Sequence, residues 1–115
     1  MLRAQTDGLG AGRGVLTPFT QGVWNVKPGL ADEFVKAWTE FADWTKAHAD
    51  GAGWAKLLRD TDDENRFVSI GPWESIAAIE RWRGLEGWGQ RVAAIRKLLV
   101  GFQPATLEAI VELHD

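Results

Sequence analysis

Hydrophobic residues recur along positions 30–49 at the spacing of one side of an α-helix. They are Phe34, Trp38 and Phe41, and the polar Thr45 continues the same side, with steps of four, three and four. Acidic side chains open this stretch and basic ones close it, which is the arrangement that the helix dipole favours. The pattern therefore predicts a long helix that ends at the glycines following residue 50.

Short apolar runs bounded by turn residues predict four strands. The first covers residues 17–26, where β-branched and aromatic side chains precede a Lys-Pro-Gly turn. Residues 54–60 and 66–73 flank a polar loop and predict a β-hairpin. After Pro104, apolar and polar side chains alternate to the end of the chain, which predicts a last strand.

The second helical region is predicted in two pieces. The first begins near Ser75, whose side chain can cap a helix N-terminus. Residues 84–89 interrupt it with glycines, and Trp88 starts a second periodic pattern that reaches Leu99. The order β-α-β-β-α-β predicts an α+β, ferredoxin-like fold, in which a four-stranded antiparallel sheet carries both helices on one face.

One domain over residues 15–115 accounts for this order, because a chain of 115 residues suits a single core. Residues 1–14 hold four glycines and are predicted to form a flexible arm. The arm lacks the apolar run of a signal peptide and no later run could span a membrane, so we expect a cytoplasmic protein with no membrane partner. Several strands carry apolar side chains on both faces, so we expect the uncovered sheet face to pair with a second copy in a homodimer.

Charge and composition exclude several classes of function. The net charge is -3 and the pI about 5.4, so there is no basic surface to hold a nucleic acid. The chain has no cysteine, which excludes disulfides and thiolate metal centres. His48 and His114 stand at the ends of the predicted helix and of the chain, and are predicted to be surface residues. The alternating acidic residues 60–64 lack the glycine and the distal glutamate of a calcium loop and are predicted to form a solvated turn.

Aromatic side chains gather in one layer of the predicted fold. Alternation along residues 66–73 places Phe67, Ser69 and Trp73 on the side of the sheet that faces the helices. The helices add further rings to the same layer. Two interpretations are open: the rings fill a solid core, or they leave a slot for a flat aromatic ligand. Each indole N–H needs a partner and few polar side chains are available here, which favours a slot that holds water or a ligand.

Two segments of the chain resemble the antibiotic biosynthesis monooxygenase family. One is VKPG with the aromatic helix after it, and the other is LLRDTDDENRFVSIGPWES with a broken second helix. The resemblance covers about residues 17–113, and FVSIGPWES is its most specific part. It implies a dimeric α+β barrel with a pocket between sheet and helices. Characterised members oxidise aromatic polyketide quinols with dioxygen and use no metal or flavin, so the resemblance implies no cofactor and no metal site. A related branch degrades haem.

The resemblance also implies site residues. Trp73 matches the family's pocket tryptophan, whose N–H can hold a substrate or peroxide oxygen, and Ser69 stands where that pattern has an asparagine. Both are predicted to be catalytic residues. Ile79 stands where the pattern has a tyrosine, and the chain has no tyrosine at all. The residues predicted to bind the substrate are Trp24, Asn25, Phe34, Trp38, Phe67, Ile79 and Trp88. Either Trp24 or Asn25 faces the pocket, and Arg59 is a further candidate whose alternative is a surface ion pair.

Three functions are compatible with these features. The first is a cofactor-independent monooxygenase whose partners are a small aromatic, quinol-like molecule and dioxygen. The second is a non-catalytic small-molecule-binding protein on the same dimeric barrel, in keeping with Ser69 and Ile79 at the family's polar positions. The third is a purely structural dimer with a filled core. Haem degradation is disfavoured, because residues 75–100 contain no histidine and Gly22 stands where that branch has an asparagine.

Overall fold

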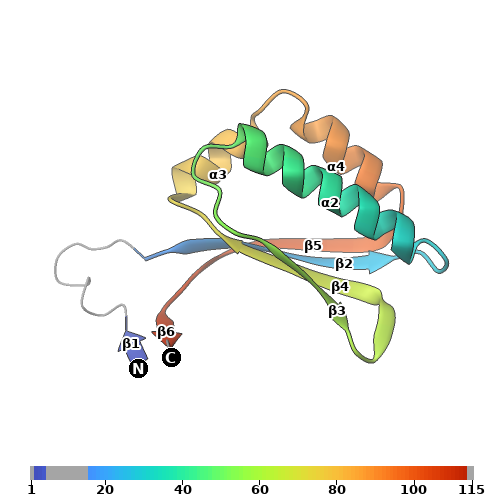
Figure 1. The fold of residues 1–115 in the computed structure, drawn as a ribbon, viewed down its shortest axis with the longest axis horizontal. Helices are drawn as coiled ribbons and strands as arrows, with labels where there is room; N and C mark the ends of the chain where they lie inside the picture. Colours follow the sequence, from blue (N-terminus) through green and yellow to red (C-terminus); the bar gives the residue numbers. More distant parts are fainter. Residues whose placement is uncertain (1, 5–15, 114–115) are drawn as a thin grey trace.

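Nine regular elements make up the part of the chain that the computed structural model describes, residues 2–4 and 16–113 (Figure 1). The strands are β1 (Leu2–Ala4), β2 (Pro18–Val26), β3 (Lys56–Asp60), β4 (Asp63–Pro72), β5 (Leu99–Glu108) and β6 (Val111–Leu113). The helices are α2 (Ala31–His48), α3 (Ile76–Arg83) and α4 (Trp88–Arg96).

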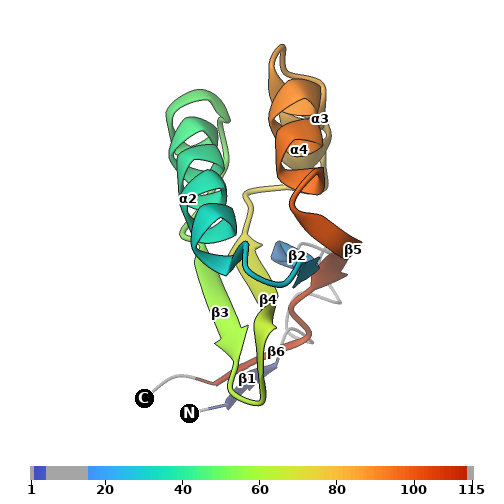
Figure 2. The same cartoon turned by 90° about the vertical axis from the view of Figure 1, so that its right-hand side faces the viewer.

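The main sheet has four antiparallel strands in the order β3-β4-β2-β5. The first strand of the β-α-β-β-α-β sequence therefore lies in the middle of the sheet, beside the last strand and the third. This arrangement confirms the predicted ferredoxin-like α+β fold. All three helices cover one face of the sheet, with α2 on one side and α3 and α4 on the other (Figure 2). No helix in the described ranges is long and apolar enough to cross a membrane.

Local chemistry explains where the helices begin and end. The Ser75 side chain accepts a hydrogen bond from the backbone N–H of Ala78 at 3.0 Å and caps α3, as predicted. Gly84 follows the last residue of α3. Gly87 precedes α4 with a φ of 95°, a left-handed conformation that glycine adopts without strain. The predicted interruption of the second helical region is therefore confirmed.

The starts of β4 and β5 were predicted three or more residues too late. Strand β4 begins at Asp63 instead of residue 66, because Asp60 Oδ1 accepts the backbone N–H of Asp62 at 2.8 Å and closes a tight turn. Strand β5 begins at Leu99, which was expected in the helix, and runs through Pro104. Proline is tolerated there because β5 is an edge strand of the main sheet and pairs only with β2.

The end of the described chain leaves the main sheet. Strand β6 follows a short break after β5 and pairs with β1, with Leu2 opposite Leu113. Both views place this small ribbon on the side of the main sheet away from the helices (Figures 1 and 2). Of the predicted arm over residues 1–14, only Leu2–Ala4 lie within the described residues.

The core lies between the sheet and the helices in two connected clusters. The larger one centres on Phe34, Phe67 and Ile95, which are fully buried side chains. The smaller one packs Trp73 against Ile79 at the C-terminal end of β4. Partly buried Trp82 contacts both clusters. Aromatic side chains thus contribute to both clusters, and residues of both clusters line the space between the sheet and the helices.

Candidate functional site

A cavity of about 400 Å³ lies between the main sheet and the helices. Its sheet side is made by β2, β4 and β5, and its helix side by residues of all three helices. Six of the seven tryptophans line it: Trp24, Trp38, Trp54, Trp73, Trp82 and Trp88. A volume of this order and walls of this kind are typical of small-molecule sites.

Small residues on the sheet make room for the cavity. Gly22 and Ser69 are paired across β2 and β4, and Gly71 lies two positions further along β4. A methyl group built on Gly22 would come within 2.8 Å of Trp24 Nε1 and 3.0 Å of Ser69 Oγ. The Trp24 indole therefore lies across Gly22, and a larger residue at position 22 would displace it.

Three of the cavity's indoles donate their N–H to a hydroxyl group. Trp24 Nε1 donates to Ser69 Oγ at 2.9 Å, and Trp73 Nε1 donates to Thr20 Oγ1 at 3.0 Å. On the helix side, Trp82 Nε1 donates to Thr45 Oγ1 at 2.9 Å. All three hydroxyl residues line the cavity. Each pair satisfies a buried indole donor and fixes the ring in place.

Trp88 differs from these three indoles. Its Nε1 is buried, and it is the one buried side-chain polar atom without a hydrogen-bond partner among the described residues. Its ring meets that of Trp82 edge to face, with centroids 5.8 Å apart and an interplanar angle of 81°. An unsatisfied N–H of this kind is costly, so this position suits an acceptor supplied by water or by a small rearrangement around a ligand.

The charged side chains that line the cavity are all basic. They are Lys46, Arg83 and Arg96, and no carboxylate among the described residues joins them. Arg83 Nη2 lies 3.5 Å from Thr106 Oγ1, which connects α3 to β5. The guanidinium of Arg96 lies over the Phe102 ring, 5.2 Å from its centroid. The ion pair that the described residues do form, between Arg66 and Asp60, lies in the β3–β4 hairpin, away from the cavity.

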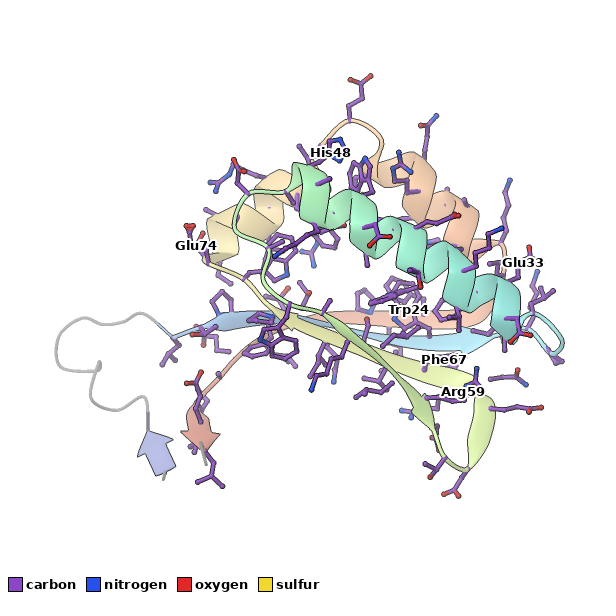
Figure 3. The ribbon with its side chains drawn as sticks, in the orientation of Figure 1. Trp24, Glu33, His48, Arg59, Phe67 and Glu74 are labelled. Carbon is purple, nitrogen blue, oxygen red and sulfur yellow. The ribbon has the colours of Figure 1, made fainter. Side chains whose placement is uncertain are left out.

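The structure brings five of the predicted site residues to the cavity: Trp24, Trp38, Ser69, Trp73 and Trp88. The other four lie elsewhere. Phe34 and Phe67 pack against each other in the core, with centroids 5.0 Å apart, and Ile79 is buried beside Trp73. Trp24 rises from β2 toward α2 (Figure 3). Asn25, the next residue, therefore faces the other side of the sheet.

Three further candidates lie away from the cavity. His48 is exposed at the end of α2, where its Nδ1 lies 2.9 Å from the Trp44 carbonyl oxygen (Figure 3). The guanidinium of Arg59 lies over the Phe67 ring at 5.0 Å and takes part in no ion pair within the described part of the chain. The acidic turn closes on Asp60, whose pKa is lowered chiefly by the backbone N–H of Asp62 and also by Arg66. Within residues 2–4 and 16–113, no three His, Cys, Asp or Glu side chains are grouped as a metal site.

The sequence did not indicate the hydroxyl partners or the basic residues of the cavity. Thr20 stands two positions before Gly22 on the same strand face, and strand alternation could have placed it there. Arg83 follows Trp82 directly, but nothing in the spacing shows that α3 turns this residue toward β5. Thr45 belonged to the predicted helix face, yet its pairing with Trp82 depends on how two helices pack.

Comparisons with known proteins agree with this fold. The sequence model of the family described as antibiotic biosynthesis monooxygenase matches residues 19–94. No curated protein sequence gives a significant match. Among solved structures, SnoaB of Streptomyces nogalater, described as a cofactor-independent oxygenase, superposes with a TM-score of 0.75 at 23% identity, over 83% of this chain and 94% of that one.

Two further structures show the same fold. A putative antibiotic biosynthesis monooxygenase of Caulobacter crescentus has a TM-score of 0.75 at 22% identity, and the match covers 83% of this chain and 91% of that one. A protein of Pseudomonas aeruginosa has a TM-score of 0.71 at 19% identity, with 85% and 98% covered. The fold and the family match together lead to one conclusion: this chain belongs to the antibiotic biosynthesis monooxygenase family.

Proposed function

We propose that this protein is a monooxygenase that oxidises a flat aromatic, quinol-like molecule with dioxygen in the cavity beside Trp73. The observation that carries the proposal is a 400 Å³ cavity with a wall of tryptophan rings in a member of this family. Flat aromatic rings stack favourably on indole faces. SnoaB, which shares the fold, is described as a cofactor-independent oxygenase.

The chemistry needs no electrons from outside. When a ring methylene of an anthrone becomes a carbonyl, the substrate gives up four electrons, and dioxygen takes them up as one product oxygen and one water. A deprotonated hydroxyaromatic is electron-rich enough to begin this transfer itself. The protein's part is to exclude water, hold the ring plane between the indoles, and place hydrogen-bond donors where negative charge develops.

The residues proposed for these tasks are those that reach the cavity. The Ser69 hydroxyl and the Trp73 ring both line the cavity, Ser69 beside Trp24 and Trp73 beside Ile79. The Trp73 N–H, expected to hold a substrate oxygen, is already donated to Thr20. In this proposal the Trp73 ring therefore serves as a wall, and the hydroxyl groups serve as donors.

A second function is supported by one observation. No carboxylate or histidine of the described residues lines the cavity, so the lining offers no ordinary general base. A protein that binds its aromatic ligand without turning it over would have such a lining. If the protein is a monooxygenase, its substrate must lose its proton to solvent or enter the cavity already ionised.

Oxygen uptake by purified protein with anthrone as the probe distinguishes a monooxygenase from a protein that only binds its ligand. We expect consumption of dioxygen and formation of anthraquinone faster than in buffer, with Trp73→Phe slower and Thr39→Val, altered on the exposed side of α2, unchanged. Saturable binding of anthrone without turnover would favour the carrier function. If the protein neither binds nor turns over anthrone or related quinols, both proposed functions are overturned.

A further inference from the structure

The three hydroxyl groups paired with indoles each accept one hydrogen bond and donate none to the described protein. They are Thr20, Thr45 and Ser69. A hydroxyl in a folded protein ordinarily donates when an acceptor is near, and the Thr39 hydroxyl does so, to the Val35 carbonyl oxygen at 2.7 Å. The cavity hydroxyls therefore keep their protons available for something that the cavity holds.

The indole N–H determines the direction in which each hydroxyl can donate and the strength of the hydrogen bond that it donates. Because the N–H occupies one lone pair of the oxygen, it polarises the O–H bond and makes the hydroxyl a better donor. The three basic side chains of the lining can only donate. The polar side chains among the aromatic lining are thus hydroxyls and cations, with Gln21 the one that also carries an amide acceptor, in a chain whose own net charge is -3.

We propose that the cavity selects its aromatic ligand in the ionised form, as a phenolate, enolate or carboxylate whose oxygen atoms accept from these hydroxyls. The inference rests on the proposed function and deepens it by naming the charge state of the substrate. Thr20 and Ser69 are diagonal neighbours on β2 and β4, since Ser69 pairs with Gly22. Diagonal positions lie about 7 Å apart, so these two hydroxyls can meet two different oxygen atoms of one flat ligand.

The charges and the hydroxyls act together on such a ligand. A hydrogen bond to an ionised acceptor is about twice as strong as one between neutral groups, so an oxyanion gains most from donors of this kind. Arg83 lines the cavity with its Nη2 3.5 Å from Thr106 Oγ1, and it has no carboxylate partner among the described residues. A ligand that enters as an anion also needs no general base in the lining, which accounts for the absence of one among the described residues.

Calorimetric titration with two naphthoquinones of similar size tests the inference. Lawsone carries an acidic hydroxyl and is an anion at neutral pH, whereas menadione carries a methyl group and is neutral. Menadione can react with thiols, but this chain has no cysteine. We expect lawsone to bind about tenfold more tightly or better, and we expect that preference to disappear when acid protonates lawsone.

Matched variants assign the preference to the hydroxyls. Thr20→Val keeps the shape of the side chain and removes its O–H. It should weaken the binding of lawsone about tenfold and change the affinity for menadione by about twofold or less. Thr20→Ser restores the hydroxyl and should restore the preference. Arg83→Gln, on the exposed end of α3, should weaken lawsone alone and reduce the effect of salt on its affinity. Thr39→Val removes a hydroxyl outside the cavity and should change neither ligand.

The outcomes separate this inference from the function on which it rests. Equal binding of both quinones, or a lawsone preference that survives Thr20→Val and Arg83→Gln, would overturn the selection of an anion and leave the cavity proposal intact. If neither quinone binds, the proposed small-molecule site itself is overturned. Circular dichroism of each variant establishes that the fold is retained, and Arg83→Gln decides the question if Thr20→Val unfolds.

Discussion

At the residue scale, the indole rings of this protein were predicted better than their hydrogen bonds. Strand alternation places Ser69 and Trp73 on the helix-facing side, and both reach the cavity. Their partners, Trp24 and Thr20, lie 45 and 53 positions away in the sequence, and only the register of β2 against β4 brings them together. Periodicity fixes the face of a side chain but not its neighbour on the next strand.

Gly22 has a steric role that predicts a measurable cost. Gly22→Ala would put a methyl group 2.8 Å from Trp24 Nε1, so the indole must tilt and its bond to Ser69 must break. We expect the free energy of unfolding to fall by about 1–3 kcal/mol in urea titrations, and lawsone binding to weaken. Gly89→Ala is the control, because a methyl group there meets nothing within 4 Å and α4 should gain up to about 1 kcal/mol. A Gly22→Ala protein of unchanged stability would contradict this account.

Asp60 predicts a dependence of stability on pH. Its folded pKa is lowered, chiefly by the backbone N–H of Asp62, so its charged form stabilises the fold at pH values above the ordinary carboxyl pKa of about 3.9. This contribution is lost as the pH falls through the lowered folded pKa. Asp60→Asn should therefore be less stable than wild type at neutral pH, and the difference should vanish in acid. Urea unfolding of both proteins at several pH values measures this difference in stability. A difference that does not change with pH would contradict the role of the Asp60 charge.

At the element scale, the predicted order and types hold for the helices and for the strands of the main sheet, because the signals are local, whereas β1 and β6 were not predicted. Helix α2 follows from its apolar spacing, and the break between α3 and α4 follows from glycines that end one helix and start another. The β3–β4 turn was predicted too long, because Asp63–Asn65 are polar yet lie in the strand. Strand β5 began earlier than predicted, because its pairing with β2 outweighs the helical periodicity at Leu99.

Ser75 connects one such element to the site. It caps α3, the helix that carries Trp82 and Arg83 to the cavity. Ser75→Ala should lower the free energy of unfolding by about 1 kcal/mol. Aspartate can also cap a helix, so Ser75→Asp should retain most of the wild-type stability. Because the cap lies about two turns from Arg83, we expect lawsone affinity to fall less than the stability does. Thermal melts and titrations of both variants measure this, and equal stability of the two variants would rule out the capping role.

At the scale of the whole molecule, the uncovered face of the sheet predicts a second copy. Leu58 and Val23 both pair with Val68, so three apolar side chains form a row across β3, β4 and β2 on the side away from the helices. Leu58 is 48% exposed and Leu107 44% exposed. Monomers seldom leave such a row in water, and a two-fold axis through the face would let the row pack on itself.

Val68 lies at the centre of this row and provides the test. Light scattering at micromolar concentration should give wild type about twice the chain mass of 12.7 kDa, and Val68→Lys close to that mass itself. A lysine there would face a second lysine across the two-fold axis, so charge repulsion adds to the lost apolar contact. Thr39→Lys, on the exposed side of α2, should remain dimeric. If Val68→Lys is monomeric and still binds lawsone as wild type does, each subunit carries a complete cavity. A monomeric wild type would instead leave the apolar row unexplained and would contradict the dimer.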